Sequence, residues 1–165
     1  MIKDPTFNTV NNDVIDLDLS ITKKKKFRFN NDDTRIVEIN TSDMNITQRV
    51  SIAYPKLEAL QEKAAKLTEG LSTEETDDAF SDLSTMAERL AEVDKEMREL
   101  LDYIFNAPVS AAAAPDGSMY DPFDGSFRYE HIIAVMIKQY EDNLQSEFGK
   151  MEKQLKKHTD KYTRR

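Results

Sequence analysis

The chain has 165 residues, of which 33% are charged, with only 4 glycines and neither tryptophan nor cysteine. This length excludes a large multidomain enzyme, and the composition suits a helix-rich protein better than a sandwich or barrel. Without cysteine there is no disulfide framework and no thiolate metal site.

The net charge of −8 is concentrated in residues 42–105, which carry seven basic against fifteen acidic groups. A helical middle of this charge repels nucleic acid unless a basic surface elsewhere outweighs it. No run approaches the roughly 18 apolar residues of a membrane helix, and the N-terminus lacks an apolar signal core. We therefore expect a cytoplasmic protein without a membrane partner.

Residues 1–41 predict a small antiparallel β-meander. Apolar and polar residues alternate over residues 14–21 with the period of two that is typical of a strand. Two further apolar runs, at residues 27–29 and 34–39, are separated by four Asn and Asp residues, which indicates a hairpin. About three such strands need a helix against their apolar face to be stable.

Four lysines at residues 23–26 lie where two of these strands join. They fit a solvated strand end that discourages edge pairing. They also fit a functional basic patch.

Residues 42–105 predict a long αα-hairpin. The apolar period changes here to that of a helix, and the first stripe comprises Ile46, Val50, Ala53, Leu57, Leu60, Ala64 and Leu67. Pro55 indicates either a kink or a helix that starts just before it, and Gly70 suits the helix end.

A capping box at residues 72–75 indicates the start of the second helix of the hairpin. Its heptad stripe comprises Ala79, Leu83, Met86, Leu90, Val93, Met97, Leu100 and Ile104. This stripe either packs onto the first helix or serves in part, at Leu90, Met97 and Ile104, as a seam for another subunit. Self-association through helices is therefore one of the expected possibilities.

Residues 106–126 predict a linker with turns, followed by a C-terminal helix with a basic tail over residues 127–165. Pro108 and Pro115 leave room for one or two helical turns between them. Gly117 and Gly125 are expected at positive φ, with Ser126 or Asp124 capping the helix. The tail, residues 150–165, holds seven basic against two acidic groups, which suits the helix dipole or attraction to the acidic segment of a neighbouring copy.

No catalytic constellation, metal site or cofactor site follows from the sequence. His131 and His158 lie on one predicted helix, roughly 40 Å apart at about 1.5 Å per residue, and so cannot share a metal. The acidic connector fails the calcium-loop pattern, because Glu130 follows Gly125 by five positions rather than six and Pro122 occupies a ligand position. We therefore expect a protein that is not an enzyme.

Large apolar side chains are concentrated in the polar connector before the last helix. They are Met119, Tyr120, Phe123, Phe127 and Tyr129. Such side chains either fold back as a small core of their own or form a contact surface for a partner. With Leu90, Met97 and Ile104 they are the candidate partner-binding residues.

Residues 117–133 read Gly-Ser-Met-Tyr-Asp-Pro-Phe-Asp-Gly-Ser-Phe-Arg-Tyr-Glu-His-Ile-Ile. This block follows a Lys-Phe-Arg-Phe strand and a charged αα-hairpin. In this order the elements resemble the tail assembly chaperones of long-tailed phages and prophages of Gram-positive bacteria. The resemblance implies a non-enzymatic cytoplasmic protein. Its partners would be the tape-measure protein, whose long apolar helices it would cover, and the major tail protein, which it would help to recruit.

Two other functions fit the same residues. A structural or adaptor component of a phage particle would use the same helices and the opposite charges of the two helical regions. A nucleic-acid-binding regulator would use the lysine run and the basic tail, and is disfavoured by the acidic middle of the chain.

Overall fold

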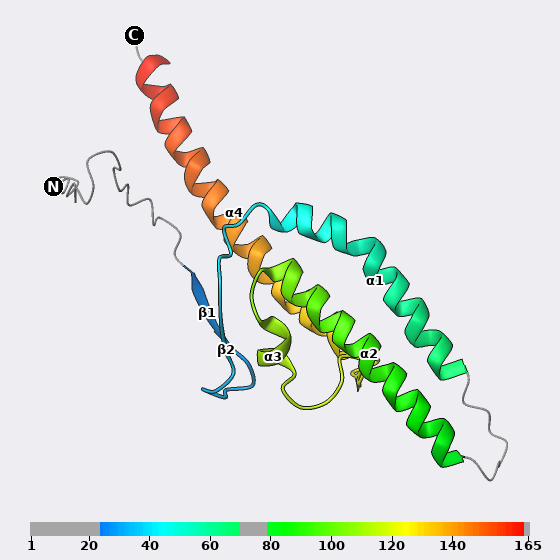
Figure 1. Ribbon diagram of the computed structural model, residues 1–165. Helices are drawn as coiled ribbons and strands as arrows, with labels where there is room; N and C mark the ends of the chain where they lie inside the picture. Colours follow the sequence, from blue (N-terminus) through cyan, green and yellow to red (C-terminus); the bar gives the residue numbers. More distant parts are fainter. Residues whose placement is uncertain (1–23, 70–78, 164–165) are drawn as a thin grey trace, which may run out of the picture.

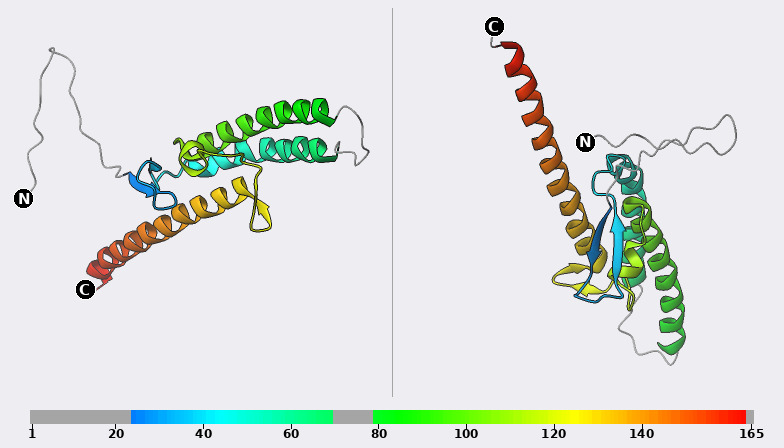
Figure 2. Two further views of the ribbon diagram at one scale, coloured as in Figure 1. Left: turned by 90° about the horizontal axis from the view of Figure 1, so that it is seen from below. Right: turned by 90° about the vertical axis from the view of Figure 1, so that its left-hand side faces the viewer.

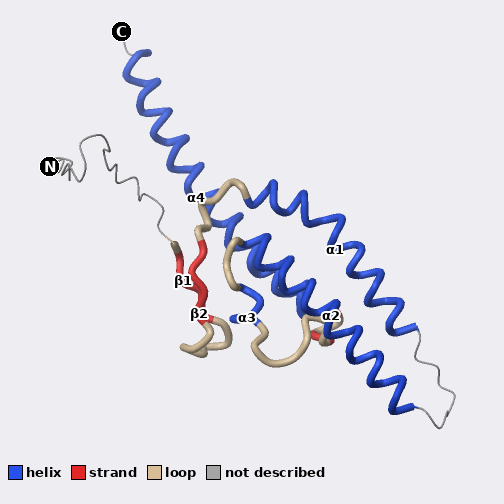
Figure 3. Tube along the Cα trace, viewed as in Figure 1, coloured by secondary structure: helices blue, strands red, loops and turns tan. Residues whose placement is uncertain are grey.

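The computed structural model describes residues 24–69 and 79–163 of the chain. Its elements are, in order, β1 (Lys25–Arg28), β2 (Ile36–Ile39), α1 (Ile46–Glu69), α2 (Ala79–Phe105), α3 (Val109–Ala113), β3 (Pro122–Phe123), β4 (Ser126–Phe127) and α4 (Arg128–Thr163). Three long helices dominate the elongated molecule, and the strands form two short pairs (Figures 1 and 3). The fold is therefore α+β and mostly α, as predicted.

Strands β1 and β2 form the hairpin predicted from the two apolar runs. They pair antiparallel, with Lys25 opposite Ile39. The turn between them contains Asn30 and Asn31 at φ 54° and 56°, a region that asparagine tolerates better than most residues. The inward residues Val37 and Ile39 are buried. The further strand predicted at residues 14–21 lies outside the described residues.

Two lysines of the run at residues 23–26 have partners within the chain. The Lys25 ammonium donates a hydrogen bond to Asn143 on α4 at 2.7 Å, and Lys26 forms an ion pair with Glu38 across the hairpin at 3.3 Å. These contacts place Lys25 and Lys26 on β1, with Lys25 next to α4.

Helix α1 continues through Pro55 instead of starting at it. Figure 1 shows that the helix changes direction along its length, as expected where a proline removes a backbone hydrogen bond. The predicted caps at Gly70 and at residues 72–75 lie outside the described residues.

Helices α1 and α2 lie side by side and antiparallel, which confirms the predicted αα-hairpin (Figures 1 and 2). The predicted stripes face each other in the core: Ile46, Ala53, Leu60, Ala64, Val93, Met97, Leu100 and Ile104 are all buried. Polar contacts reinforce the pairing, since Arg49 donates to the Ile104 carbonyl at 2.7 Å and Lys63 pairs with Glu96 at 3.2 Å.

The segment between α2 and α4, which the sequence led us to expect as a linker with turns, contributes to the core. Val109 and Met119 are fully buried and Ala114 is 1% exposed. Residues of the β1–β2 hairpin, the αα-hairpin, this segment and α4 share one buried cluster. The segment therefore joins the helices into a single body.

Helix α4 has two parts with different surroundings. Its first half covers the body, with Tyr140 packed against Phe105 at a ring-centroid distance of 6.1 Å. The Asn143 amide donates to the Thr41 carbonyl at 3.2 Å. Beyond Asn143 the helix projects away from the body, opposite to the tip of the αα-hairpin, by which we mean the end where α1 stops and α2 begins (Figures 1 and 2).

Candidate partner-binding site

The connector before α4 contains a second, very short hairpin. Pro122 pairs with Phe127 and Phe123 with Ser126, which leaves a two-residue loop of Asp124 and Gly125. Both loop residues have positive φ, 46° and 83°, as a type I′ turn requires. The expected positive φ at Gly117 and Gly125 is confirmed. Sequence reasoning missed the hairpin itself, although an Asp-Gly pair between two apolar residues is its usual signal.

The Asp94 carboxylate on α2 holds the connector against the helical hairpin. It accepts hydrogen bonds from the Ser118 hydroxyl at 2.9 Å and from the Met119 amide. It also accepts one from the Arg98 guanidinium at 2.7 Å. Two donors from the connector and one from the next turn of α2 thus converge on one largely buried side chain.

Arg98 extends this contact along the connector. Its guanidinium donates to the carbonyls of Ala114 at 2.8 Å and Gly117 at 2.6 Å. The connector has few regular backbone hydrogen bonds of its own, so these side-chain donors satisfy its carbonyls. Sequence reasoning missed Asp94 and Arg98, whose spacing of four on one helix was the available signal.

The pKa of Asp94 reflects these contacts. Burial on its own would raise the pKa, but the hydrogen bonds from Arg98, the Met119 amide and Ser118 outweigh burial and lower it. A carboxyl group whose pKa is lower in the folded than in the unfolded chain stabilises the fold at every pH above its pKa in the unfolded chain. That stabilisation is lost as the pH falls through its pKa in the folded chain.

At neutral pH the substitution Asp94→Asn is expected to lower the free energy of unfolding by about 1–2 kcal/mol, because a charged acceptor becomes a neutral one. The difference from the wild type should shrink as the pH falls below about 4, where the wild-type carboxylate also becomes protonated. Urea unfolding over a pH series measures both effects. If the difference in unfolding free energy between the wild type and the variant stays constant down to about pH 2.5, the proposed role of the carboxylate is wrong.

Two aromatic residues of the connector and one in the first turn of α4 form a small core. Tyr120 contacts Tyr129 and Phe127 edge to face, with ring centroids 5.4 and 5.7 Å apart. The Tyr129 hydroxyl accepts a hydrogen bond from Gln61 on α1 at 2.7 Å. Burial raises the pKa of both tyrosines above its ordinary value. The cluster therefore fixes the start of α4 against the helical hairpin.

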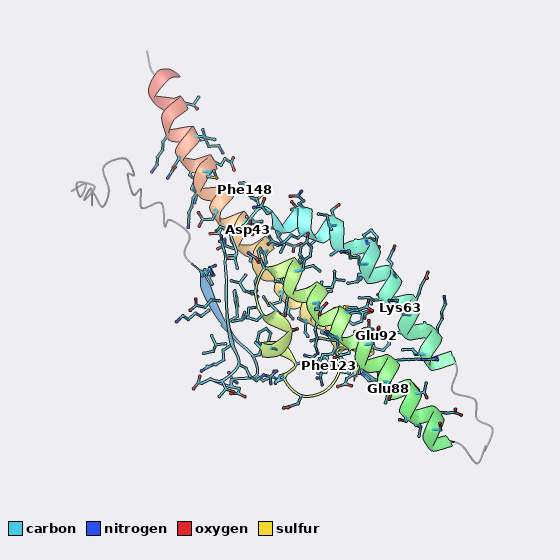
Figure 4. All side chains as sticks on the ribbon, in the orientation of Figure 1. Asp43, Lys63, Glu88, Glu92, Phe123 and Phe148 are labelled. Carbon is cyan, nitrogen blue, oxygen red and sulfur yellow. The ribbon has the colours of Figure 1, made fainter. Side chains whose placement is uncertain are left out.

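Phe123 lies apart from this cluster and on the surface (Figure 4). The residue is 55% exposed, and its ring meets the His131 ring edge to face with centroids 4.8 Å apart. A His131 ring nitrogen lies 2.8 Å from the Phe123 carbonyl oxygen, within hydrogen-bond distance. The histidine thus holds the tip of the β3–β4 hairpin against α4, which leaves the phenylalanine ring facing outward.

A cleft of about 350 Å³ opens beside Phe123, between the β1–β2 turn, the end of α3 and the first turns of α4. Its lining residues are Phe29, Asn30, Arg35, Ala113, Ala114, Pro115, Asp116, Phe123, Arg128, His131, Ile132 and Val135. Most of these are apolar, so the cleft suits an apolar side chain of a partner.

Two arginines support the walls of this cleft. Arg35 donates to the Ala112 carbonyl at 2.8 Å and also to that of Ala113, and Arg128 donates to the Asp116 carbonyl at 2.8 Å. Because both guanidinium groups bind backbone carbonyls, they position the wall segments. The large apolar side chains left at the rim are Phe123 and Val135, which are 55% and 56% exposed.

The eight candidate residues divide by their surroundings. Those buried in the core of the chain are Met97, Ile104, Met119, Tyr120 and Tyr129. Leu90 is half-buried on α2, and Phe127 is 38% exposed on top of the aromatic cluster. Phe123 is thus the most solvent-exposed of the eight candidates. Val135, at the same rim, was not among the site residues predicted from the sequence.

Residues 24–69 and 79–163 contain no group of three or more His, Asp or Glu side chains placed to hold a metal ion. Within the same ranges no helix is long and apolar enough to cross a membrane.

Comparisons of the chain with protein-family models, with curated proteins and with solved structures found no match.

Proposed function

We propose that this chain is a non-enzymatic tail assembly chaperone of a long-tailed phage, which binds the tape-measure protein in the host cytoplasm and helps to recruit the major tail protein. The observation that supports this most directly is the pair of exposed apolar side chains, Phe123 and Val135, at the rim of an apolar cleft. Exposed apolar groups beside a concave surface are typical of a protein-binding site.

The size of the cleft indicates what it accepts. A volume of about 350 Å³ is at the lower end for ligand pockets, so it accommodates one or two large side chains rather than a whole helix. A partner helix would lie across the rim and insert an apolar anchor, as in helix-in-groove recognition. The long apolar helices of a tape-measure protein offer many such anchors.

The charge of the chain suits this task. At −8 it keeps a complex with an apolar partner dispersed, because like-charged assemblies repel one another. Arg35, Arg128 and His131 each bind a segment of the wall, so the cleft is preformed, and a preformed site loses less entropy on binding.

Co-expression with the tape-measure protein of the same phage is expected to increase the soluble fraction of that protein and to yield a complex that co-purifies. The double substitution Phe123→Ser and Val135→Ser should abolish both effects, because it removes the apolar rim. The soluble fraction and pull-down yield are the measurements, with thermal unfolding of each variant as a check on folding.

Tyr54→Ser provides a matched control, since Tyr54 is an aromatic on α1 with 58% exposure and lies outside the cleft lining. It should retain the wild-type behaviour. Equal solubility of the tape-measure protein with and without this chain would contradict the proposed function. Loss of binding by the control alone would contradict the proposed site.

A structural or adaptor component of a phage particle is the second candidate. It is favoured by the projecting part of α4, which offers a further contact surface outside the body (Figure 2). The two candidate functions differ in whether the protein remains in the mature virion. Mass spectrometry of purified mature virions should detect an adaptor and should not detect a chaperone.

A further inference from the structure

Arg35 is the one half-buried arginine of residues 24–69 and 79–163 that has no carboxylate partner. The other half-buried arginines of these ranges each pair with an aspartate, at 2.9, 2.7 and 3.3 Å, and they are Arg49, Arg98 and Arg128. A charge that is partly withdrawn from water is usually paired, because losing hydration without a counter-charge costs free energy. The counter-charge that Arg35 lacks is therefore expected from outside the described chain.

Two aspartates near Arg35 do not supply this charge. The pKa of Asp32 is lowered mainly by hydrogen bonds from Thr34, and the charge of Arg35 is the smallest cause. The Asp32 carboxylate accepts from the Thr34 hydroxyl at 2.6 Å. Asp116 lines the same cleft as Arg35, but it is exposed and forms no ion pair with any described residue.

The guanidinium group of Arg35 is held in place and still has a free donor. Its Nε donates to the Ala112 carbonyl at 2.8 Å, and its Nη2 donates to the Ala113 carbonyl. Its Nη1 forms no hydrogen bond within the described chain, and the fully buried atoms that lack a partner belong to Arg49 and Tyr120. Nη1 is therefore open to solvent, where a carboxylate of a partner can replace water.

The charge of Arg35 borders the apolar surface of the cleft beside Phe123. The lining combines Arg35 with Phe29 of the same hairpin and with Ile132 and Val135 of α4. A carboxylate matches the planar fork of a guanidinium group, and the attraction between them is stronger beside apolar groups than in bulk water. An apolar group and a carboxylate presented together would therefore satisfy both parts of the cleft.

We infer that the cleft recognises a partner helix by two neighbouring side chains, an apolar anchor that enters beside Phe123 and an Asp or Glu carboxylate that pairs with Arg35. This inference rests on the proposed function and specifies the segment that the chaperone site binds. Helix residues three or four positions apart lie on one face, with Cβ atoms about 5–6 Å apart. That separation fits a cleft of about 350 Å³, which holds one or two large side chains.

Peptides that tile the tape-measure protein of the same phage test this inference against the full chain. A length of about 20 residues is suitable, because shorter helices are marginal in water. Fluorescence anisotropy is expected to find peptides whose binding is lost with the Phe123→Ser chain. Replacing the acidic residue three or four positions from the anchor by its amide should weaken binding to the wild type about tenfold. Added salt should weaken the binding of the acidic peptide more than that of the amide peptide.

Arg35→Gln completes a double-mutant cycle. It removes the charge and keeps an amide donor for the carbonyls of the wall. It should bind the acidic peptide about tenfold more weakly than the wild type does, and it should bind the acidic and amide peptides equally, because the pair is already broken. Thermal unfolding checks that the variant folds. If it does not, the comparison of the two peptides on the wild type still decides whether the carboxylate is recognised.

Arg28→Gln is the matched control for the cycle. Arg28 lies on the same hairpin as Arg35 but outside the cleft lining, and it pairs with Asp33 at 2.7 Å on the surface. This variant should bind both peptides as the wild type does.

Three results would overturn the inference. The first is equal affinity of the acidic and amide peptides for the wild type. The second is a preference for the acidic peptide that persists in Arg35→Gln and disappears in Arg128→Gln, which would assign the carboxylate to Arg128. The third is the absence of any peptide whose binding depends on Phe123. The first two results leave the proposed function intact, whereas unchanged solubility of the tape-measure protein on co-expression contradicts the proposed function itself.

Discussion

Replacing Arg98 by methionine is expected to lower the free energy of unfolding by about 3 kcal/mol. The substitution removes the hydrogen bonds to Asp94 and to the carbonyls of Ala114 and Gly117, and it leaves the Asp94 carboxylate, whose side chain is 17% exposed, without its cation. Methionine retains most of the aliphatic length of arginine, so lost packing contributes little. Chemical unfolding in urea measures the change.

Lys95→Met is the matched control for this prediction. Lys95 lies on the same helix and pairs with Glu99 at 3.9 Å, where both side chains are largely exposed. Such a pair contributes about 0.5 kcal/mol or less. Equal effects of the two substitutions would show that the connector is not held by Arg98.

Tyr120→Ala is expected to destabilise the fold by about 4 kcal/mol, whereas Phe123→Ala should change stability by less than about 1 kcal/mol. Both substitutions remove an aromatic ring from the same connector. Tyr120 is 6% exposed and contacts two other rings, while Phe123 is 55% exposed. Thermal unfolding compares the stability of the two variants with that of the wild type. Binding of the tape-measure protein compares their affinity for the partner.

The expected pattern is a separation of the two effects. Tyr120→Ala should lose stability, and Phe123→Ala should lose partner binding while its unfolding temperature is nearly unchanged. A Phe123→Ala chain that binds like the wild type would remove this residue from the proposed site. A Tyr120→Ala chain of wild-type stability would contradict the aromatic core.

The regular elements could be predicted because their signals are local. A period near 3.5 in the apolar residues predicted α1 and α2, and α2 ends at Phe105 where its stripe ends. Four turn-forming residues predicted the β1–β2 hairpin. The effect of Pro55 could not be decided in this way, because whether a helix tolerates a kink depends on the packing around it.

The candidate site was predicted only in part. Its connector and its aromatic residues were identified from composition, but an irregular segment has no period that assigns a face to each side chain. The contacts of Asp94 with Ser118 and Met119 span 24 and 25 positions, and nothing in the local sequence signals them. The cleft combines residues from the β1–β2 turn, α3 and α4, so its existence depends on how these segments meet.

The sequence by itself determined which segments are helical, which faces of them are apolar, and that the middle of the chain is acidic and its C-terminal end basic. Only the tertiary structure decided that Tyr120 lies inside while Phe123 lies outside, and that α4 extends past the body with Phe148 exposed. The physical reason is the range of the forces involved. Backbone hydrogen bonding and apolar periodicity act over a few residues, whereas burial is set by contacts between segments that are distant in the chain.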